Sequence, residues 1–284
     1  MLDDVVGCLA CPQCGAGLAR AGPALRCPAG HAFDIARQGY VSLLPPGGRA
    51  PAGDSAPMVA ARADFLAAGH YGPLARALAA AARAAVSGTG APGCVLDIGA
   101  GPGYYLAAVL DGLPDRAGLA LDASRFALRR AARAHPRIGA AAADAWRRLP
   151  VADGAAAVVL NVFAPRGGAE LRRVLHPAGR LLVVTPAPGH LAELAGPLGL
   201  LHVDPRKQER LAATVGPHFR LLEQRPQAAA LQLDHRDVAA LAGMGPSARH
   251  ADPAVLAARI RELPATVPVT LSVTLSVFGP RPGE

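Results

Sequence analysis

The feature that most constrains the fold of this chain is the stretch from Val95 to Tyr104, VLDIGAGPGY, in which a short apolar run ends in three glycines at alternating positions. Residues 94–98 are apolar and partly β-branched, which predicts a buried parallel strand. Residues 104–113 carry leucine and valine at helical spacing. The glycines therefore lie in a strand-to-helix turn. Such turns bind ligands in doubly wound sheets, because glycine lets the backbone approach closely and the helix N-terminus offers free N–H groups.

Strand and helix patterns alternate along most of the remaining chain. Helical spacing predicts two helices in residues 56–86, the second opened by Pro73. Residues 267–278 alternate valine, leucine and threonine, which predicts an antiparallel edge strand paired with residues 221–233. Repeated β-α units predict an α/β fold with a mostly parallel, Rossmann-like sheet covered by helices on both faces. Further strands are predicted at residues 118–122, 138–143, 155–162 and 179–185, and further helices at residues 124–134 and 170–175.

A group of cysteines near the start of the chain predicts a metal site. Cys11 and Cys14 are followed after twelve residues by Cys27 and then His31, in the pattern C-x2-C-x12-C-x3-H. Each close pair fits a tight turn, and the segment between them is long enough for a hairpin, so the four side chains can surround one tetrahedral Zn²⁺ ion. Three thiolates and an imidazole fill every position of such an ion. The site is therefore predicted to be structural, with zinc supplying folding free energy to a segment poor in large apolar side chains.

Cys8 leaves the ligand set open, because Cys8 and Cys11 also form a C-x2-C pair. Pro12 and Gly15 favour Cys11 and Cys14 as the ligands, since they suit a zinc-knuckle turn. A leftover thiol is readily buried as a small hydrophobe. Disulfides are the weaker interpretation where no secretory signal is found.

The charge of the chain is +8, which suits a polyanionic partner such as nucleic acid. Lys207 is the only lysine, so the excess is arginine, and a GC-rich coding bias with ordinary solvated charge remains the alternative. The sequence has no apolar run of about 18 residues, the length of a membrane-spanning helix. The first four residues include two aspartates where a signal peptide would be basic. We therefore expect a cytoplasmic protein with no membrane partner.

Asp97, two residues before the first glycine, separates the candidate cofactors. The loop is G-x-G-x-G, which differs from the dinucleotide fingerprint G-x-G-x-x-G. A carboxylate beside it suits the ammonium group of S-adenosylmethionine and repels a phosphate; the plain structural alternative is a loop cap. Asp122 is placed to accept hydrogen bonds from ribose hydroxyls, and Asp144 to reach the adenine amino group. The predicted cofactor site comprises Asp97, Gly99, Ala100, Gly101, Gly103, Tyr104, Asp122 and Asp144.

Longer motifs narrow the interpretation. After the cysteine pattern come F-D-x4-G-Y-V-x-L-L-P from Phe33, R-x2-F-L-x-A-G-H-Y-x-P-L from Arg62, D-I-G-x-G-x-G-Y-Y from Asp97, N-V-F-A-P-R from Asn161 and T-P-x-P-x-H-L-x-E-L from Thr185. The chain thus resembles the class I methyltransferases, and within them the RlmA family. Members of that family are zinc-containing enzymes that methylate N1 of a guanine in large-subunit ribosomal RNA.

The resemblance implies an enzyme that uses S-adenosylmethionine and one structural Zn²⁺, acts on 23S rRNA and forms a homodimer. It also implies that Tyr71 and His190 help to hold S-adenosylmethionine. The expected domains are a zinc-finger RNA-recognition module at residues 1–45, a linker with helices at 46–86 and the methyltransferase domain at 87–284. One branch of the family defends bacteria against tylosin-type macrolides, and the composition together with the N-V-F-A-P-R motif suggests that branch.

The sequence also bears on which atom of the base is methylated and on which residues are catalytic. The N-V-F-A-P turn departs from the [ND]-P-P-Y motif of many exocyclic-amine methyltransferases, which favours a ring nitrogen as the target. Guanine N1 carries a proton, so the enzyme must assist its removal or stabilise charge on the neighbouring oxygen. The candidates near the strand ends are Asp144, Asn161 and Arg166, although positioning alone can supply much of the rate.

Two other functions remain open at this point. A small-molecule methyltransferase of secondary metabolism would keep the cofactor residues and use the zinc module only to build the fold. A non-catalytic RNA-binding regulator would not need Asp97, Asp122 and the glycines together. In the preferred interpretation the zinc module clamps RNA with Arg20, Arg26 and Arg37, which can equally form a solvated face. Binding to ribosomal RNA that weakens steeply with salt separates the first alternative from the preferred function.

Overall fold

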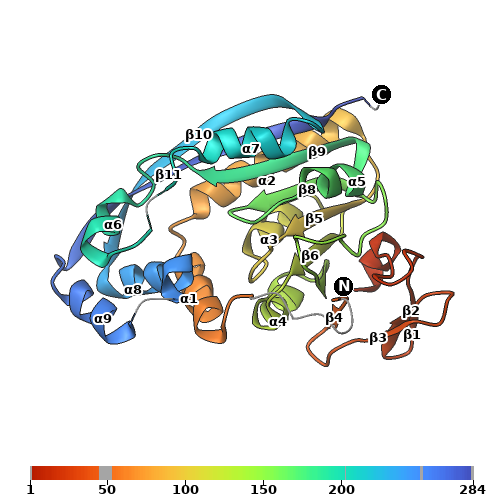
Figure 1. Ribbon diagram of the computed structural model, residues 1–284, viewed down its shortest axis with the longest axis horizontal. Coiled ribbons are helices and arrows are strands. Elements are labelled where there is room, and N and C mark those ends of the chain that lie inside the picture. The colour runs from red at the N-terminus through yellow and green to blue at the C-terminus, as the bar shows by residue number, and fades with distance from the viewer. Residues whose placement is uncertain (1, 45–52, 202, 250–251, 283–284) are drawn as a thin grey trace.

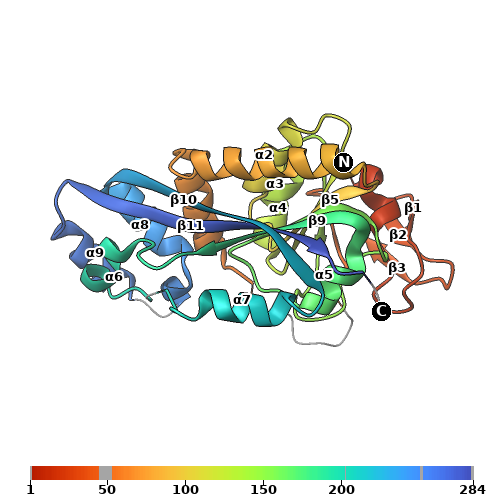
Figure 2. The same cartoon turned by 90° about the horizontal axis from the view of Figure 1, so that it is seen from above.

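The computed structural model describes residues 2–44, 53–201, 203–249 and 252–282. Its main element is an eight-stranded sheet in the order β10-β11-β9-β8-β5-β6-β7-β4, covered by helices on both faces (Figures 1 and 2). Strands β4, β7, β6, β5, β8 and β9 are parallel to their neighbours, and β11 is antiparallel to both β9 and β10. The strands are β4 (Tyr40–Ser42), β5 (Cys94–Ile98), β6 (Gly118–Asp122), β7 (Ile138–Ala142), β8 (Ala156–Val162), β9 (Leu175–Pro186), β10 (Phe219–Asp234) and β11 (Thr266–Pro280).

The order of the strands confirms the predicted class I methyltransferase fold. The sheet begins with β5 at its centre, extends through β6 and β7 to one side, and continues through β8 and β9 to the other. The last strand, β11, is inserted antiparallel between β9 and β10. Because the chain reverses its direction of growth at β5 and β8, the carboxyl ends of these two strands flank the crevice in which an open α/β sheet binds its ligand.

The helices have recognisable local causes. The N-terminus of α1 (Ala56–Ala67) is capped by the Ser55 hydroxyl, which accepts a hydrogen bond from the Met58 N–H at 3.4 Å. Ser124 caps α4 (Arg125–Ala134) in the same way. Pro73 lies in the first turn of α2 (Gly72–Thr89), as predicted. The remaining helices are α3 (Tyr104–Asp111), α5 (Gly168–Val174), α6 (Ala192–Leu198), α7 (Lys207–Val215), α8 (His235–Met244) and α9 (Pro253–Arg261).

One prediction about the sheet is wrong, and several elements were not predicted. Residues 267–278 pair with β10 as expected, but β11 is an interior strand, because its other side pairs with β9; the edge strand is β10. Alternation of apolar and polar residues indicates that one face of a strand is exposed, and it does not show whether both sides are paired. The sequence analysis also missed β4, whose three residues are too few for a pattern, and helices α6 to α9.

The N-terminal segment forms a three-stranded antiparallel sheet of β1 (Ala19–Ala21), β2 (Ala24–Arg26) and β3 (Ala32–Asp34), preceded by a 3₁₀ helix, η1 (Asp3–Cys8). Backbone hydrogen bonds from Ala10 N to Pro150 O and from Ala152 N to Cys8 O attach it to the segment that connects β7 and β8. The apolar side chains of both parts form one continuous cluster. The small sheet therefore shares a core with the large domain.

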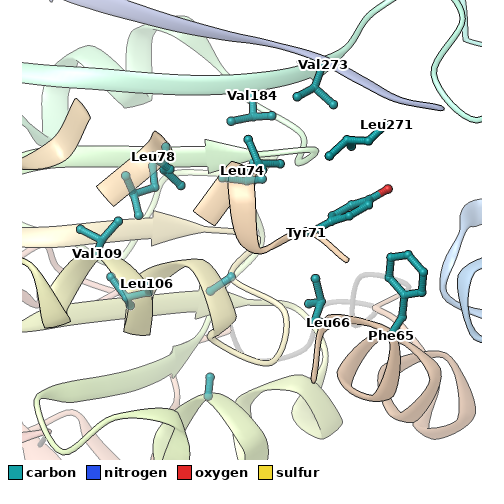
Figure 3. Close-up of a cluster of buried hydrophobic side chains, with 14 of the residues drawn as sticks. Phe65, Leu66, Tyr71, Leu74, Leu78, Leu106, Val109, Val184, Leu271 and Val273 are labelled. Carbon is teal, nitrogen blue, oxygen red and sulfur yellow. The ribbon is translucent and has the colours of Figure 1, made fainter. Parts of the chain in front are cut away.

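A second hydrophobic cluster lies on the other face of the sheet, beneath α2 and α3. Figure 3 shows Leu78 of α2 beside Val109 of α3 at one end of the cluster, and Tyr71 between Leu66 and Leu271 at the other. This cluster fixes the position of the turn before α2. No helix in the described ranges has the length and apolar character needed to span a membrane.

Candidate functional site

The glycine loop is held between two neighbours that leave no room for side chains. All three glycines have positive φ. A Cβ on Gly99 (φ +74°) would lie 2.6 Å from the Cβ of Ala164, and a Cβ on Gly103 would lie 3.0 Å from the Cα of Ala131 in α4. The first and third glycines are therefore required both by their backbone conformation and by close packing. The loop is wedged between α4 and the turn that follows β8.

Asp122 binds the same loop from the end of β6. Its Oδ2 accepts the N–H of Gly101 at 2.8 Å, and its Oδ1 accepts the N–H of Ser124 at 2.7 Å. Burial raises the pKa of this carboxyl group, and the two backbone N–H groups act in the opposite direction. Each carboxylate oxygen has capacity for a further hydrogen bond, so Asp122 can order the loop and still accept a donor from a ligand.

Asp97 is the most strongly perturbed acid of the site. Its side chain lies at the end of β5 and the residue is 1% exposed. Burial, and then the neighbouring Asp122, raise the pKa of Asp97 from 3.8 to about 8. A cation beside this buried carboxyl group would stabilise its ionised form, whereas a phosphate would oppose ionisation. Ionised Asp97 therefore fits the ammonium group of S-adenosylmethionine and does not fit a pyrophosphate.

Asp144 lies just beyond β7, on the same edge of the sheet. Its Oδ1 accepts the N–H of Trp146 at 2.9 Å, and its Oδ2 lies 3.5 Å from Nε of Arg147. The two bonds form a tight turn in which Trp146 is 74% exposed. The carboxylate thus already has two protein partners.

The turn after β8 is closed by its own side chains. Asn161 is fully buried, and its Nδ2 donates to the carbonyl of Pro165 at 3.0 Å. Its Oδ1 is buried and has no hydrogen-bond partner within the described residues. Arg166 donates to the carbonyl of Ala164 at 2.9 Å, and burial lowers the pKa of its guanidinium to about 10. Arg166 therefore remains protonated at neutral pH.

Three aromatic rings meet beside this turn. Phe163 and His190 are stacked, with ring centroids 6.0 Å apart and planes 17° apart. Tyr71 is buried, 6.4 Å from Phe163 and 6.5 Å from His190. Burial raises the pKa of Tyr71 and lowers that of His190 to about 4. Both groups are therefore neutral at physiological pH.

Sequence reasoning assigned no role to Arg62 or Phe163, although both belong to quoted motifs. The guanidinium of Arg62 lies over Gly101, 3.7 Å from where a Cβ would be, and it donates to Met244 O at 2.7 Å and pairs with Asp54. Gly53 packs against the backbone of Ser124. Helix α1 thus covers the glycine loop through Arg62, and Asp54 in the segment before α1 holds that side chain, an arrangement that no local pattern indicates.

The zinc-binding pattern converges in space. The ligand atoms of Cys11, Cys14, Cys27 and His31 all lie within 4.8 Å of one another. The Cys14 and Cys27 sulfurs are 3.7 Å apart, and His31 Nδ1 is 3.5 Å from the Cys11 sulfur and 3.3 Å from that of Cys27. A tetrahedral zinc ion with ordinary bond lengths requires edges of about 3.8 Å between sulfurs and about 3.5 Å between sulfur and nitrogen. The four residues therefore fit one Zn²⁺ ion.

Cys8 lies outside this cluster. Its sulfur lies 3.9 Å from the carbonyl oxygen of Ala155, and a hydrogen bond with Cys94 lowers its pKa to about 7. The expectation that Cys8 is the leftover thiol agrees with this placement.

The predicted residues thus gather along one edge of the sheet. Asp97, Asp122 and Asn161 lie in the last two residues of β5, β6 and β8, and Asp144 lies two residues beyond β7; these four strands are neighbours in the sheet. Tyr71 comes from the turn before α2, and His190 from the loop after β9.

Comparison with known proteins gives matches over the whole chain. Residues 9–47 match the family model of the RlmA N-terminal zinc ribbon. A candidate 23S rRNA (guanine-N(1)-)-methyltransferase from Micromonospora griseorubida is 55% identical over 99% of this chain and 100% of its own. The 23S rRNA (guanine(748)-N(1))-methyltransferase of Streptomyces fradiae is 53% identical, with the same coverage. A Bacillus subtilis relative, also named as a candidate 23S rRNA (guanine-N(1)-)-methyltransferase, is 35% identical over 65% of this chain and 66% of its own.

Proposed function

The chain belongs to the RlmA-type 23S rRNA (guanine-N1) methyltransferases, and from this membership we propose that it methylates N1 of a guanine in a hairpin loop of 23S rRNA near the peptide exit tunnel. The observation that carries the proposal is the match along nearly the whole chain to a relative named for this reaction at guanine 748. The corresponding guanine is the proposed target. The buried acid beneath a glycine loop, joined to a zinc ribbon, supports the same reaction.

S-adenosylmethionine supplies an electrophilic methyl group on its sulfonium. We assign the ammonium group to Asp97, the ribose hydroxyls to Asp122 and the adenine amino group to Asp144. Tyr71 and His190 complete the site at the methionine end. Gly99, Ala100, Gly101, Gly103 and Tyr104 form the loop that lets the cofactor approach the backbone. Cys11, Cys14, Cys27 and His31 bind the structural zinc.

The three catalytic candidates differ in what they can do. Asn161 is an amide and Arg166 stays protonated, so neither can accept the N1 proton. Asp144 can accept a proton, but its carboxylate already binds Trp146 and Arg147. This favours a role for Arg166 in stabilising the negative charge that develops on the guanine oxygen as N1 is alkylated. Positioning of the base opposite the methyl group supplies the rest.

The zinc ribbon, at residues 1–45, is the proposed RNA clamp, followed by the connecting segment 46–86 and the methyltransferase domain 87–284. Arg26 and Arg37 are exposed on the ribbon, whereas Arg20 forms an ion pair with Asp3 at 3.1 Å. Arg26 and Arg37 are therefore better placed than Arg20 to contact phosphates. We further propose that the protein is a cytoplasmic homodimer and that methylation protects its host from tylosin-type macrolides.

The direct test incubates purified protein with radiolabelled S-adenosylmethionine and deproteinised 23S rRNA. Primer extension then maps the product, because a methyl group on N1 blocks base pairing and stops the polymerase. A stop at the guanine that corresponds to position 748 is the expected result. Transfer of label to a small molecule, with none to RNA, would contradict the proposal. Resistance is tested separately, by growth of a susceptible host that expresses the gene on tylosin.

A further inference from the structure

Two residues other than glycine have positive φ within the described residues, Phe163 (φ 53°) and Leu191 (φ 55°). They lie on different loops, after β8 and β9, and both adjoin the same aromatic stack, since Leu191 follows His190 directly. Left-handed backbone is unfavourable for side chains of this size and persists only where surrounding contacts impose it. Both loops that support the stack are therefore held in strained conformations.

The contacts that impose the strain on Phe163 are specific. Its N–H donates to Val184 O of β9 at 3.1 Å, and the following residue, Ala164, packs against Gly99 of the glycine loop. The Asn161 side chain also holds the turn, because its Nδ2 donates a hydrogen bond to the carbonyl oxygen of Pro165. The backbone of the turn that carries Phe163 is thus fixed by β9 and, through Ala164, by the loop that we propose to hold the cofactor.

The strained backbone at Phe163 leaves a large part of its ring exposed to solvent. Phe163 is 40% exposed, although the turn places it beside the buried Tyr71 and the half-buried His190. One face of the ring is stacked on His190, whose Nδ1 accepts the N–H of Ser272 at 3.2 Å and which is therefore fixed in turn. A large aromatic ring held rigidly in a strained turn, with exposed surface next to a cofactor site, is suited to stacking on a planar ligand.

We propose that the exposed face of Phe163 is the platform on which the target guanine stacks, in the order base, Phe163, His190. This inference rests on the proposed function, because it needs a base extruded from an RNA hairpin. Enzymes that modify a base remove it from the helix and read it between aromatic or apolar side chains. Stacking on Phe163 orients the guanine ring and so presents its N1 edge; Phe163 positions the base and takes no part in proton transfer.

The test uses the full-length, zinc-loaded protein and the 23S rRNA hairpin, with methylation followed at saturating S-adenosylmethionine. Calorimetry with S-adenosylhomocysteine measures cofactor binding for each variant. Phe163→Tyr and Phe163→Trp keep a ring, and they should retain kcat/KM for RNA within about threefold of the unaltered protein. Phe163→Leu keeps the apolar bulk without the ring and should lower kcat/KM by about 5- to 150-fold, the range expected for one lost base stack. The affinity for S-adenosylhomocysteine should differ from that of the unaltered protein by less than twofold in all three variants.

Phe163→Gly separates a role in substrate binding from a role in folding. Glycine adopts φ near +53° without strain, so this variant should melt at or above the temperature of Phe163→Ala, while both lose activity equally. Leu221→Ala is the matched control, because Leu221 is an exposed apolar residue of β10, 52% accessible, and pairs with Phe278 far from the glycine loop. It should leave kcat/KM unchanged.

Three outcomes would overturn the inference. Full activity of Phe163→Leu would show that the aromatic ring is not needed. A parallel loss of S-adenosylhomocysteine binding would assign the ring to the cofactor, and a loss of activity that follows the loss of thermal stability would assign it to folding. If the unaltered protein transfers no methyl group to rRNA, the proposed function itself fails and the inference falls with it. Failure of the proposed function is therefore distinguished from failure of the inference, because the unaltered protein alone shows whether rRNA is methylated.

Discussion

At the scale of single residues, Asp97 shows how burial creates a binding preference. Its carboxyl group lies at the end of β5 with a pKa raised to about 8, so in the free protein it is largely protonated at neutral pH. An incoming ammonium group stabilises the ionised form. Ligand binding is then coupled to the release of a proton from a group that has no access to water.

This coupling predicts the pH dependence of cofactor binding. Affinity for S-adenosylhomocysteine should rise between about pH 5.5 and 7.5, by up to tenfold per pH unit, because Asp97 must lose its proton to bind the ammonium group. Calorimetry across this range measures the effect. Asp97→Asn should bind weakly and without the rise. A flat profile for the unaltered protein would contradict the proposed role of Asp97.

The same raised pKa has an effect of opposite sign on folding. The unfolded chain releases the Asp97 proton near pH 4, whereas the folded chain retains it up to about pH 8, so the contribution of this group to stability falls as the pH rises between these values. Without bound cofactor, the Asp97→Asn variant should therefore melt at a higher temperature than the unaltered protein at pH 8. The difference in melting temperature should be smaller at pH 5. Asp122→Asn is the contrasting variant. It should melt at a lower temperature at both pH values, because Asp122 accepts two backbone N–H groups that an amide cannot fully satisfy.

At the scale of elements, the site depends on contact between two loops. The glycine loop and the turn after β8 interlock at Gly99 and Ala164, and the same turn carries Asn161, Phe163 and Arg166. Any shift of one loop therefore moves the groups supplied by the other. This arrangement places the proposed base platform and the cofactor loop in a fixed relation.

Gly99→Ala should disrupt this contact. We expect a loss of about 2–4 kcal/mol in the free energy of unfolding, because the new methyl group meets Ala164 and also requires positive φ. Gly90→Ala is the matched control, since Gly90 has φ +60° and nothing within 4 Å of a Cβ; it should lose only about 1–2 kcal/mol. Adding Ala164→Gly should restore Gly99→Ala to the level of the control. Denaturant unfolding gives all four values, and equal losses for Gly99→Ala and Gly90→Ala would show that the two loops are not tightly packed.

At the scale of the whole molecule, the zinc ribbon is part of the main core. Leu9 and Leu25 of the ribbon belong to the same apolar cluster as Leu96 and Leu119 of the large sheet. Strand β4, which follows the three-stranded sheet within residues 1–45, extends the large sheet beside β7. Loss of the metal is therefore expected to affect more than the ribbon.

Cys14→Ser should lose the bound zinc and lower the melting temperature of the whole chain, because the unfolded ribbon exposes part of the shared core. Metal analysis and circular dichroism measure the two effects. Cys8→Ser is the control: its thiol lies outside the cluster, so the variant should keep one zinc per chain. The shared core would be contradicted if Cys14→Ser lost zinc and yet melted at the temperature of the unaltered protein.

The parts of this protein that depend on local chemistry could be predicted from the amino-acid sequence. The ligand spacing predicted the zinc cluster, and the break from an apolar run to alternating glycines predicted the strand, the turn and the helix that begins at Tyr104. The longer motifs predicted the family. These features could be predicted because each one is encoded within a few consecutive residues.

Features that depend on contacts between distant segments became visible only in the folded chain. The interior position of β11 follows from pairing with β9, nearly a hundred residues earlier in the chain. The cover of Arg62 over Gly101 depends on Asp54 and Met244, and the strain and exposure of Phe163 depend on contacts with β9 and the glycine loop. No local pattern records such contacts, because the free energy that fixes them comes from packing between segments far apart in sequence.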